Sequence, residues 1–599
     1  MTEPLAARPP ASEPRAPLGI APAPPVRAVP RAGPGVAASA WRRWAPAATI
    51  ALLALLASFT SLANGFTYDD GYIVAANERV HSFKHLGSLF VDSYWGPGSP
   101  AGGYRPLTLL AFTIEWVVGG TRPIVFHAAN ILIYTLAAVA VLALARRCMP
   151  LAAAWVAASL FAVHPVHVEA VANVVGQAEL IVALACAGGV ALYVRERSRA
   201  RMHWPVVWGV LGCFAAAVLA KENGIVFPVL LLAAELTVVT DLRPLKQRFV
   251  TVRPLVLSLV LVGLLYIGGR GLVLGDLAGM PPHVAYVGLH LTNAHRVLTM
   301  IGLAKEWARL LLWPAKLAAE YSPPMTPFAV EMSIEQLPGL LLLVGTALLF
   351  WISIKRGWRD ASFGIAWVAI AMAPISGFLV ATGFILAERT LMLPSIGAMI
   401  VVAALGRRIW NAIPIVTRNR SVVRIASAAL LGAILLAGAV RSATRQIVWH
   451  DNDVLFSQTI VDAPNSYRAH QIFGAWLFAR GFRGQGEEQM WQAIRLFPYD
   501  PIPPYLLAEE YRKKGACNLA IPLYRWSLAT TDTAASFSLA PYGRCLMKTG
   551  QYELARAQAL RGIGRGVEVR HYRRLLMQID SARRSSALSG KAQIIGKRQ

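Results

Sequence analysis

Eleven apolar runs limit what this chain can fold into more than any other feature. Most are long enough to cross about 30 Å of hydrocarbon as an α-helix. They lie at 45–63, 124–145, 151–163, 177–194, 204–220, 224–240, 253–270, 337–354, 362–381, 391–407 and 422–440. Charged residues make up only 15% of the 599 residues, whereas soluble domains carry about 25%. The sequence therefore predicts an all-α, polytopic membrane protein with about eleven transmembrane helices.

Two stretches depart from this pattern. The run at 151–163 is short, and we expect it to tilt or to break at Pro165. The stretch at 296–313 is apolar but contains Arg296, Lys305, Glu306 and Arg309. We expect this second stretch to form a helix that lies at the membrane interface.

Basic residues gather in every second connection between the runs, which predicts an orientation. They are Arg146, Arg147, Arg195, Arg197, Arg199, Arg201, Arg243, Lys246, Arg248, Arg253, Lys355, Arg356, Arg359, Arg407, Arg408, Arg418, Arg420 and Arg424. With the N-terminus inside, these connections are cytoplasmic, and eleven spans place the C-terminal part outside. The formal net charge is +26. Without a basic helix or nucleic-acid motif, however, this charge predicts contact with membrane lipid and no nucleic-acid partner.

The pattern divides the chain into four regions. Residues 1–40 contain ten prolines and no apolar periodicity, which predicts a disordered cytoplasmic leader. Residues 41–445 form the transmembrane domain with its external loops. Amphipathic helical segments occupy 446–570. Residues 571–599 form a basic C-terminal tail. We expect its end, with Arg583, Arg584, Lys591, Lys597 and Arg598, to be frayed.

The region 446–570 carries a repeat. Gly481, Gly515 and Gly550 recur at intervals of 34 and 35 residues, where a tetratricopeptide repeat turns between its two helices. The small residues that would let paired helices approach are Gly486, Ala520 and Ala555. The spacing predicts a short tetratricopeptide-repeat α-solenoid of three units, with the first unit closed by Pro498.

The five cysteines include no Cys-x-x-Cys pair, so the sequence predicts neither a zinc site nor a thioredoxin-like motif. Cys517 and Cys545 both lie in the repeat region. They either pair in an oxidising compartment or remain two buried free thiols.

Asp69 and Asp70 lie just beyond the first apolar run. Ionisable residues close to hydrocarbon are costly and therefore functional candidates. Consecutive side chains point in different directions, so we expect one acid to act as a base and the other to fix the geometry. The alternative is that the pair caps the next helical segment.

Three cations lie in the same set of external connections. Arg105 precedes the helical stretch that begins at Pro106, Lys221 follows the fifth run and Arg389 precedes the tenth. Arginine and lysine bind phosphate, so all three are candidates for holding a phosphate group. Alternatively, Lys221 and Arg389 pair with their neighbours Glu222 and Glu388, or extend to the interface.

His164, His167 and Glu169 are supporting candidates on the same side. The His-x-x-His spacing would place both imidazoles on one helical face and permits a metal site. Pro165 favours a turn there, however, and no His-Glu-x-x-His pattern is present. We therefore favour structural roles, or hydrogen bonds to a substrate or an acid, and assign no metal ligand.

These motifs together resemble the transmembrane and tetratricopeptide-repeat O-mannosyltransferase (TMTC) family of GT-C glycosyltransferases. The resemblance covers roughly residues 60–570. The residues that carry it are Phe66-Thr67-Tyr68-Asp69-Asp70, Tyr104-Arg105-Pro106-Leu107, Phe126-His127-Ala128-Ala129-Asn130, the run from Phe161 to Leu180 with its His164-Pro165-Val166-His167-Val168-Glu169, Lys221-Glu222-Asn223-Gly224 and the run from Ala387 to Gly397 with its Glu388-Arg389.

The resemblance implies an eleven-helix GT-C fold and an inverting transfer. The donor would be a polyprenyl- or dolichyl-phosphate sugar, with mannose favoured, and the acceptor a protein Ser or Thr hydroxyl. By analogy the catalytic acid is Asp69 or Asp70, with Asp69 preferred, and the donor phosphate binds near Arg105, Lys221 and Arg389. Glu222 and Glu388 have supporting roles. We expect that no cofactor is required. Whether a divalent cation takes part is left open.

Other functions stay open beside this one. The sugar could pass to a lipid or a glycan, or the protein could be a non-enzymatic membrane scaffold that recruits partners through its repeats. The Ala- and Arg-rich composition is typical of a bacterial chain, which would place the repeats in the periplasm. In a eukaryote they would lie in the lumen of the endoplasmic reticulum.

Overall fold

The computed structural model describes residues 40–96, 102–197, 202–241, 243–275, 289, 291–418, 420–530, 536–566 and 569–596. The predicted leader, 1–40, lies outside them except for its last residue. The chain divides into two compact units, Met1–Pro46 and Ala47–Gln599, and the fold below is that of the second. Throughout the described ranges the secondary structure is helical, apart from one isolated bridge between Pro324 and Ser466.

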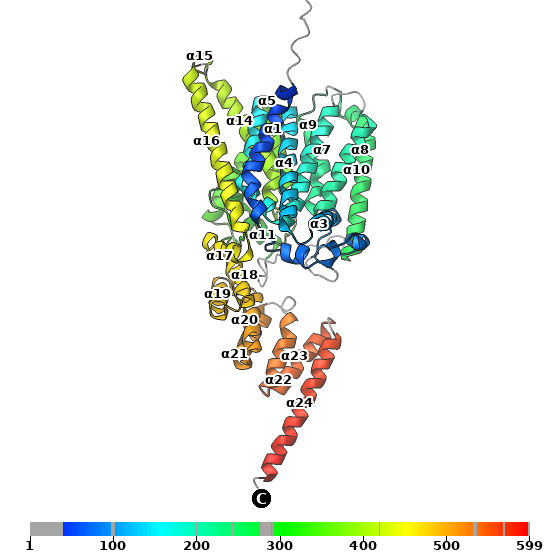
Figure 1. Cartoon of the computed structure of the whole chain (residues 1–599), viewed down its shortest axis with the longest axis vertical. Coiled ribbons are helices and arrows are strands. Elements are labelled where there is room, and N and C mark those ends of the chain that lie inside the picture. Colours follow the sequence, from blue (N-terminus) through cyan, green and yellow to red (C-terminus); the bar gives the residue numbers. More distant parts are fainter. Residues whose placement is uncertain are drawn as a thin grey trace, which may run out of the picture. The chain divides into compact units, whose positions relative to one another are not determined.

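The apolar part is a bundle of helices (Figure 1). Its α-helices are α1 Ala40–Ser58, α2 Leu86–Val91, α3 Pro106–Gly119, α4 Pro123–Cys148, α5 Leu151–Ala162, α6 Val168–Ala172, α7 Gln177–Arg197, α8 Trp204–Ala220, α9 Phe227–Thr237, α10 Leu245–Leu274, α11 Asn293–Leu312, α12 Leu337–Lys355, α13 Arg359–Met372, α14 Met392–Ala412, α15 Ile415–Arg418 and α16 Ser421–Gln446. Proline stands at the first or second position of α3, α4, α8, α9 and α12, where its missing N–H leaves no backbone bond unmade.

Seven helical stretches of the described residues are long and apolar enough to cross a membrane. They are Trp44–Ala63, Pro123–Cys148, Val174–Arg197, Lys246–Leu274, Ile334–Lys355, Glu388–Ala412 and Ser421–Trp449. An eighth is Leu151–Ala162 with Pro165–Ala172, if this pair, bent by 46°, counts as one span. The break at Pro165 is the one that the sequence predicts. The chain is thus a multi-pass membrane protein, whereas the count of eleven spans stays a prediction.

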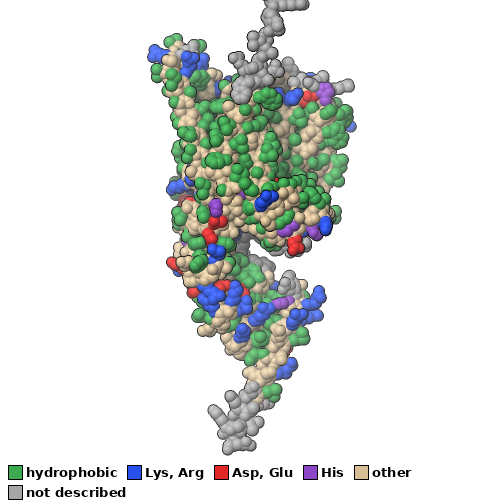
Figure 2. Space-filling model, in the orientation of Figure 1, with side chains coloured by type: hydrophobic (Ala, Val, Ile, Leu, Met, Phe, Trp, Pro, Cys, Tyr) green, Lys and Arg blue, Asp and Glu red, His purple; other side chains and the backbone are tan. Residues whose placement is uncertain are grey.

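The structure has fewer membrane-length helices than the eleven predicted runs because several of the helices are short. Each predicted run contains a helix, but α8, α9 and α13 have only 17, 11 and 14 residues. In the predicted run 362–381, helix α13 stops at Met372, about halfway along. The stretch 296–313 is helical as α11, and its interfacial position stays a prediction. Figure 2 shows hydrophobic side chains over the middle of the bundle and Lys and Arg gathered at the end that carries α15.

The bundle is packed tightly where small residues meet. α4 packs on α7, α7 on α8, and α13 on α14. A Cβ added at Gly397 of α14 would lie 2.5 Å from the carbonyl oxygen of Gly364 on α13. Glycine is therefore required where these two backbones approach, as in other membrane helix pairs.

The C-terminal part is a series of helices. They are α17 Asn452–Asp462, α18 Tyr467–Ala479, α19 Arg483–Leu496, α20 Ile502–Lys513, α21 Cys517–Thr530, α22 Leu539–Lys548, α23 Tyr552–Gly564 and α24 Val569–Gly596. Successive helices pack on one another, with the α18–α19, α20–α21 and α22–α23 pairs joined most closely. Gly481, Gly515 and Gly550 occupy the turns inside these pairs with φ of 85°, 79° and 78°. The predicted turn positions are confirmed, because residues with side chains rarely adopt this left-handed geometry.

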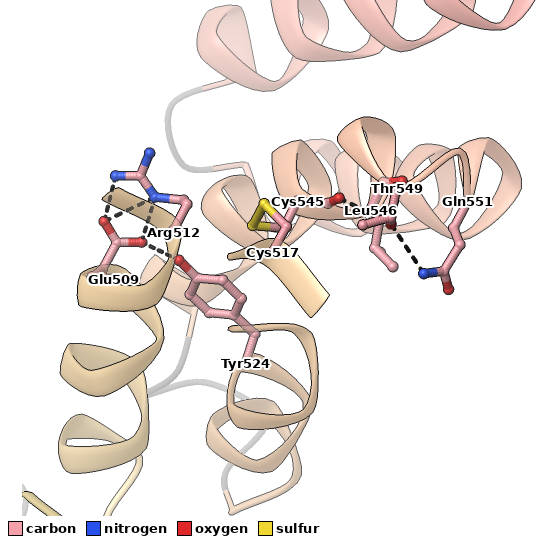
Figure 3. Close-up of a disulfide and its surroundings, with 8 residues drawn as sticks. All are labelled: Glu509, Arg512, Cys517, Tyr524, Cys545, Leu546, Thr549 and Gln551. Carbon is pink, nitrogen blue, oxygen red and sulfur yellow. Dashed lines mark hydrogen bonds and ion pairs between the residues drawn. A yellow bond between two sulfur atoms is a disulfide. The ribbon is translucent and has the colours of Figure 1, made fainter. Parts of the chain in front are cut away.

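Cys517 and Cys545 form a disulfide between α21 and α22 (Figure 3). This settles the choice between a pair and two free thiols. Beside it, Tyr524 and Arg512 both donate to the carboxylate of Glu509. The disulfide and this polar group join three successive helices, α20, α21 and α22.

The basic tail that the sequence predicts from residue 571 is helical as α24 up to Gly596, and the fraying of its end stays a prediction. Tyr572, Leu575 and Ile579 are buried in the same hydrophobic cluster as residues of α22 and α23. Their spacing of three and four residues places them on one helical face, which explains why this basic segment is ordered.

Candidate functional site

The loop that carries Asp69 is fixed by residues far away in the sequence. Tyr68 has φ of 54°, the only positive φ of a non-glycine residue in the described part of the chain. Its N–H donates to Oδ1 of Asn452 at 2.8 Å, and the N–H of Gly65 donates to the carbonyl of His450 at 2.8 Å. A strained backbone of this kind persists only where its surroundings hold it. Here α17 and the residues before it do so.

Asp70 has a structural environment. Its side chain is fully buried and accepts three backbone hydrogen bonds, from Thr67 at 3.2 Å, Val174 at 3.1 Å and Val175 at 2.9 Å. Burial raises the pKa of Asp70 to about 7, against these donors. The carboxyl thus ties the loop to the segment that follows α6.

Asp69 has the opposite environment. Its side chain is partly exposed, and no described residue donates a hydrogen bond to it or forms an ion pair with it. Burial raises the pKa of Asp69, and the nearby Arg389 opposes this rise, followed by Arg105 and Arg468. Asp69 is therefore a free carboxylate among cations, which suits an acid that must accept a proton.

Arg389 and Arg105 act electrostatically on the carboxylate of Asp69, and Lys221 lies within electrostatic reach of both arginines. Each of the three predicted cations is held by a different glutamate. Arg105 Nε donates to Oε2 of Glu222 at 2.9 Å, and its guanidinium lies over the ring of Tyr94, 4.8 Å from the centroid. The N–H of Tyr104 donates to the other oxygen of Glu222 at 3.0 Å. Glu222 therefore fixes both the backbone and the side chain of the Tyr104–Arg105 segment.

Lys221 and Arg389 are paired across long sequence distances. Lys221 Nζ donates to Glu179, and Arg389 binds Glu169 through its guanidinium and through its N–H, the latter at 2.9 Å. The alternative in which each cation pairs with its neighbour, Lys221 with Glu222 and Arg389 with Glu388, is wrong. Neighbouring side chains diverge, and the carboxylates of α6 and α7 lie closer.

The remaining supporting candidates hold the loops around the cluster. His164 contacts the carbonyl of Leu311 at 3.0 Å, and His167 contacts the Tyr134 hydroxyl at 3.1 Å and Ser395 Oγ at 2.8 Å. These contacts occupy the ring nitrogens of His167, and Glu169 is bound to Arg389. No three His, Cys, Asp or Glu side chains in the described ranges are grouped so that they could hold a metal ion.

Glu388 also supports a loop. Its Oε1 accepts from the N–H of Ala318 and the hydroxyl of Tyr321, both at 2.6 Å. This places residues 318–321 beside the start of α14. Burial raises the pKa of Tyr321 well above its ordinary value, so the hydroxyl keeps its proton and acts as the donor.

Sequence reasoning missed a fourth ion pair. Arg468 Nε lies 3.4 Å from Oε1 of Glu320, and the Tyr68 hydroxyl approaches Oε2 of Glu320 at 3.5 Å. Burial raises the pKa of Glu320, while Arg468 opposes this. Arg468 belongs to α18, in the predicted repeat region, and no local motif links it to the loop of Asp69.

The chain is similar in sequence to several proteins of known name. The chain is 28% identical to human protein O-mannosyl-transferase TMTC4 over 470 residues, which is 69% of this chain and 61% of the human protein. It is 26% identical to mouse TMTC3, over 67% of this chain and 46% of that protein. Drosophila melanogaster Tmtc2 is 34% identical over 185 residues, which is 29% of this chain and 20% of that protein. The chain is thus similar in sequence to the TMTC proteins over about two thirds of its length.

The aligned region covers less than two thirds of these TMTC relatives. No protein-family model matches the chain. Among solved structures, the archaeal oligosaccharyltransferase AglB of Archaeoglobus fulgidus, in complex with an inhibitory peptide and a dolichol-phosphate, aligns with a TM-score of 0.41 and 13% identity. That alignment covers 68% of this chain and 56% of AglB.

Proposed function

We propose that the chain is an inverting membrane glycosyltransferase that moves a sugar from a polyprenyl- or dolichyl-phosphate carrier to Ser or Thr hydroxyls of a protein. The TMTC relatives are named protein O-mannosyl-transferases, which favours mannose. The observation that carries the proposal is the contrast between the two acids. Asp70 is bound by three backbone donors, whereas Asp69 is free beside Arg389.

In the proposed step Asp69 takes the proton of the acceptor hydroxyl. The hydroxyl oxygen attacks the anomeric carbon, the bond from that carbon to the phosphate oxygen breaks, and the lipid phosphate leaves with the bonding electrons. Arg105, Lys221 and Arg389 stabilise the negative charge that develops on the phosphate. Attack opposite the leaving group inverts the anomeric configuration.

The glutamate partners explain why these cations are ready to act. Glu222, Glu179 and Glu169 hold Arg105, Lys221 and Arg389 in fixed positions, so that little reorganisation is needed when a phosphate arrives. A divalent cation could add to this charge. The proposed step uses the protein's own cations, because the described carboxylates and imidazoles do not group as ligands.

We also propose which side of the membrane the candidate site faces. We propose a GT-C arrangement of eleven spans, in which the Asp69 cluster and the C-terminal helices lie on the non-cytoplasmic side, the periplasm in a bacterium. The Cys517–Cys545 disulfide supports an oxidising compartment for these helices. We propose that the helices form a tetratricopeptide-repeat solenoid that holds the acceptor protein.

The test is transfer by the purified chain in liposomes supplied with a labelled mannosyl-phosphate polyprenol and a Ser/Thr-containing protein acceptor. Asp69→Asn should abolish transfer while leaving the melting temperature unchanged. Asp92→Asn, the same change at a partly exposed aspartate that follows α2 in the same connection between α1 and α3, should transfer at the wild-type rate. Full activity of Asp69→Asn would remove the proposed base.

Product analysis separates the alternatives. Label on protein Ser or Thr supports the proposal, whereas label on a lipid or a glycan indicates a different acceptor. A scaffold without enzymatic activity predicts no transfer from any polyprenyl-phosphate sugar in a panel, and no effect of Asp69→Asn on complementation of a deletion strain.

A further inference from the structure

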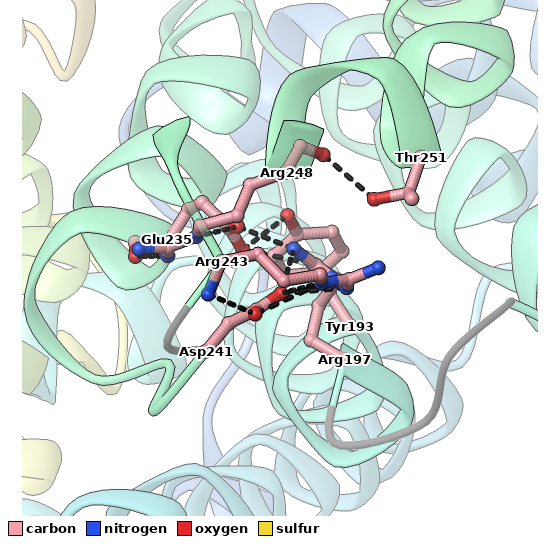
Figure 4. A network of polar contacts seen from close by, with 7 residues as sticks. All are labelled: Tyr193, Arg197, Glu235, Asp241, Arg243, Arg248 and Thr251. Atoms are coloured by element: carbon pink, nitrogen blue, oxygen red, sulfur yellow. Dashed lines mark hydrogen bonds and ion pairs between the residues drawn. The ribbon is translucent and has the colours of Figure 1, made fainter. Parts of the chain in front are cut away.

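A second polar cluster joins the ends of α7 and α9 to the start of α10 (Figure 4). Glu235 accepts from Arg197 Nε at 2.9 Å, from Arg248 Nε at 3.0 Å and from the Tyr193 hydroxyl at 2.8 Å. The side chain of Arg197 is 1% exposed. This inner part of the cluster is fully committed to contacts within the protein.

The outer part reaches solvent at Arg243. Asp241 accepts from Arg243 Nε at 3.0 Å and lies 3.3 Å from Arg197, so that it holds the Arg243 guanidinium against the buried group. The Arg243 side chain is nevertheless 34% exposed. A guanidinium held in this way can bind an anion with little loss of side-chain entropy.

Arg243 lines a cavity of about 500 Å³ together with Lys246, Gln247, Val250 and Thr251. Lys246 and Gln247 are exposed, and no described residue bonds their side chains. The cluster contains three arginines and Lys246 against the carboxylates of Glu235 and Asp241, which leaves two positive charges in excess. The cavity therefore offers an unpaired ammonium beside a fixed guanidinium.

The cavity also lies at the end of a span. The membrane-crossing stretch of α10 begins at Lys246. Phe249, Val250 and Leu257, which follow on α10, are 56%, 63% and 58% exposed. A ligand at this position meets cations at its polar end and exposed apolar side chains beyond them, which is the order of groups in a phospholipid.

We propose that this cavity binds the phosphate head group of an anionic glycerophospholipid. Arg243 and Lys246 contact the phosphate, Gln247 offers its amide to the rest of the head group, and the acyl chains lie along Phe249 and Val250. The hydroxyl of Thr251 donates to the carbonyl of Arg248 at 2.7 Å, so it offers an acceptor only. Basic pockets at the ends of membrane helices suit such head groups. The site is separate from the Asp69 cluster and does not depend on the proposed transferase activity.

The test uses the full chain in detergent with defined lipids. Native mass spectrometry would count retained phosphatidylglycerol against phosphatidylcholine. Lys246→Gln alone and Arg243→Gln with Lys246→Gln should lower phosphatidylglycerol retention, the double change by about tenfold. The matched control is Lys355→Gln with Arg356→Gln, two exposed cations at the end of the α12 span, which should retain wild-type binding.

The single change guards against a folding defect, because it leaves every ion pair of Glu235 and Asp241 intact. Equal retention by wild type and both Lys246 variants would overturn the proposal. So would an equal loss in the control pair, which would indicate diffuse attraction to the membrane surface. Displacement of the lipid by millimolar inorganic phosphate would assign the cavity to a free anion and overturn the lipid assignment.

Discussion

Arg468 Nε lies 3.4 Å from Glu320 Oε1, and through this pair helix α18 contacts the loop that carries Asp69. The contact is reinforced nearby. Ser322 and Ser466 share a hydrogen bond of 2.6 Å, and the N–H of Tyr467 donates to the carbonyl of Pro323 at 3.1 Å. The first C-terminal helices are thus built into the candidate site and are more than an appended arm.

A double-mutant cycle should measure this link. Glu320 is largely buried, so removing Arg468 leaves a carboxylate without its cation. We expect Arg468→Gln to destabilise the protein more than Arg468→Gln with Glu320→Gln, with a coupling of about 1–3 kcal/mol. Chemical unfolding in detergent would measure it. The exposed Arg556–Asp580 pair is the control and should show almost no coupling.

Asn452 should matter for transfer. Its Oδ1 accepts from the N–H of Tyr68, whose φ of 54° is unfavourable for tyrosine. Asn452→Ala leaves that N–H unpaired, at a cost of about 1–3 kcal/mol, and frees the backbone next to Asp69. We expect a transfer rate at least about tenfold lower, measured with labelled donor. Asn452→Asp keeps an acceptor oxygen and should retain most activity. Equal loss in both variants would contradict the hydrogen-bond argument.

The sequence predicts the parts of this site better than their pairing. Asp69, Arg105, Lys221 and Arg389 stand out because charge beside an apolar run is costly, and this cost is visible locally. Their partners are not visible in the same way. Lys221 and Glu179 are 42 residues apart, and Arg389 and Glu169 are 220 apart, so only the packing of the helices brings them together.

In the C-terminal helices, too, local features can be predicted from the sequence, whereas packing between distant segments cannot. Gly481, Gly515 and Gly550 could be placed in turns from their spacing, since a positive φ is a local demand. Helix α24 is not anticipated, because its many basic residues are typical of a solvated tail. The apolar spacing of Tyr572, Leu575 and Ile579 was the signal that could have found it.

Asp70 should make stability depend on pH. Its pKa is about 7 in the folded protein and about 3.9 in an unfolded chain. The folded state therefore binds a proton more tightly. The stability from this group is complete below pH 4 and is lost as pH rises through 7, by up to about 4 kcal/mol. Melting temperatures from pH 4 to 8 would show the decline. Asp70→Asn should flatten it, and an unchanged slope in that variant would assign the decline to other groups.

The disulfide should stabilise the C-terminal helices. Cys517 and Cys545 close a loop of 28 residues, which restricts the unfolded chain by about 3–4 kcal/mol. We expect Cys517→Ser with Cys545→Ser to raise hydrogen exchange in α21 and α22 and to leave α4 and α7 unchanged. Reductant should have the same effect on wild type and none on the variant. Uniform exchange across the chain would indicate global unfolding instead.

The pH dependence of transfer should report the charge around Asp69. The acid must be ionised to take a proton, so the rate should rise with pH through its pKa, which burial places above the ordinary value. Arg389 lowers this pKa, and Glu169, its partner, raises it. Arg389→Gln removes the effect of Arg389 and leaves that of Glu169, so the acid limb of the rate–pH profile should move to higher pH.

The control is Arg389→Lys, which keeps the charge and should leave the acid limb in place even if it weakens donor binding. Initial rates at saturating donor from pH 4 to 9 separate the two effects. A limb that stays fixed in Arg389→Gln would mean that the titrating base is a group other than Asp69.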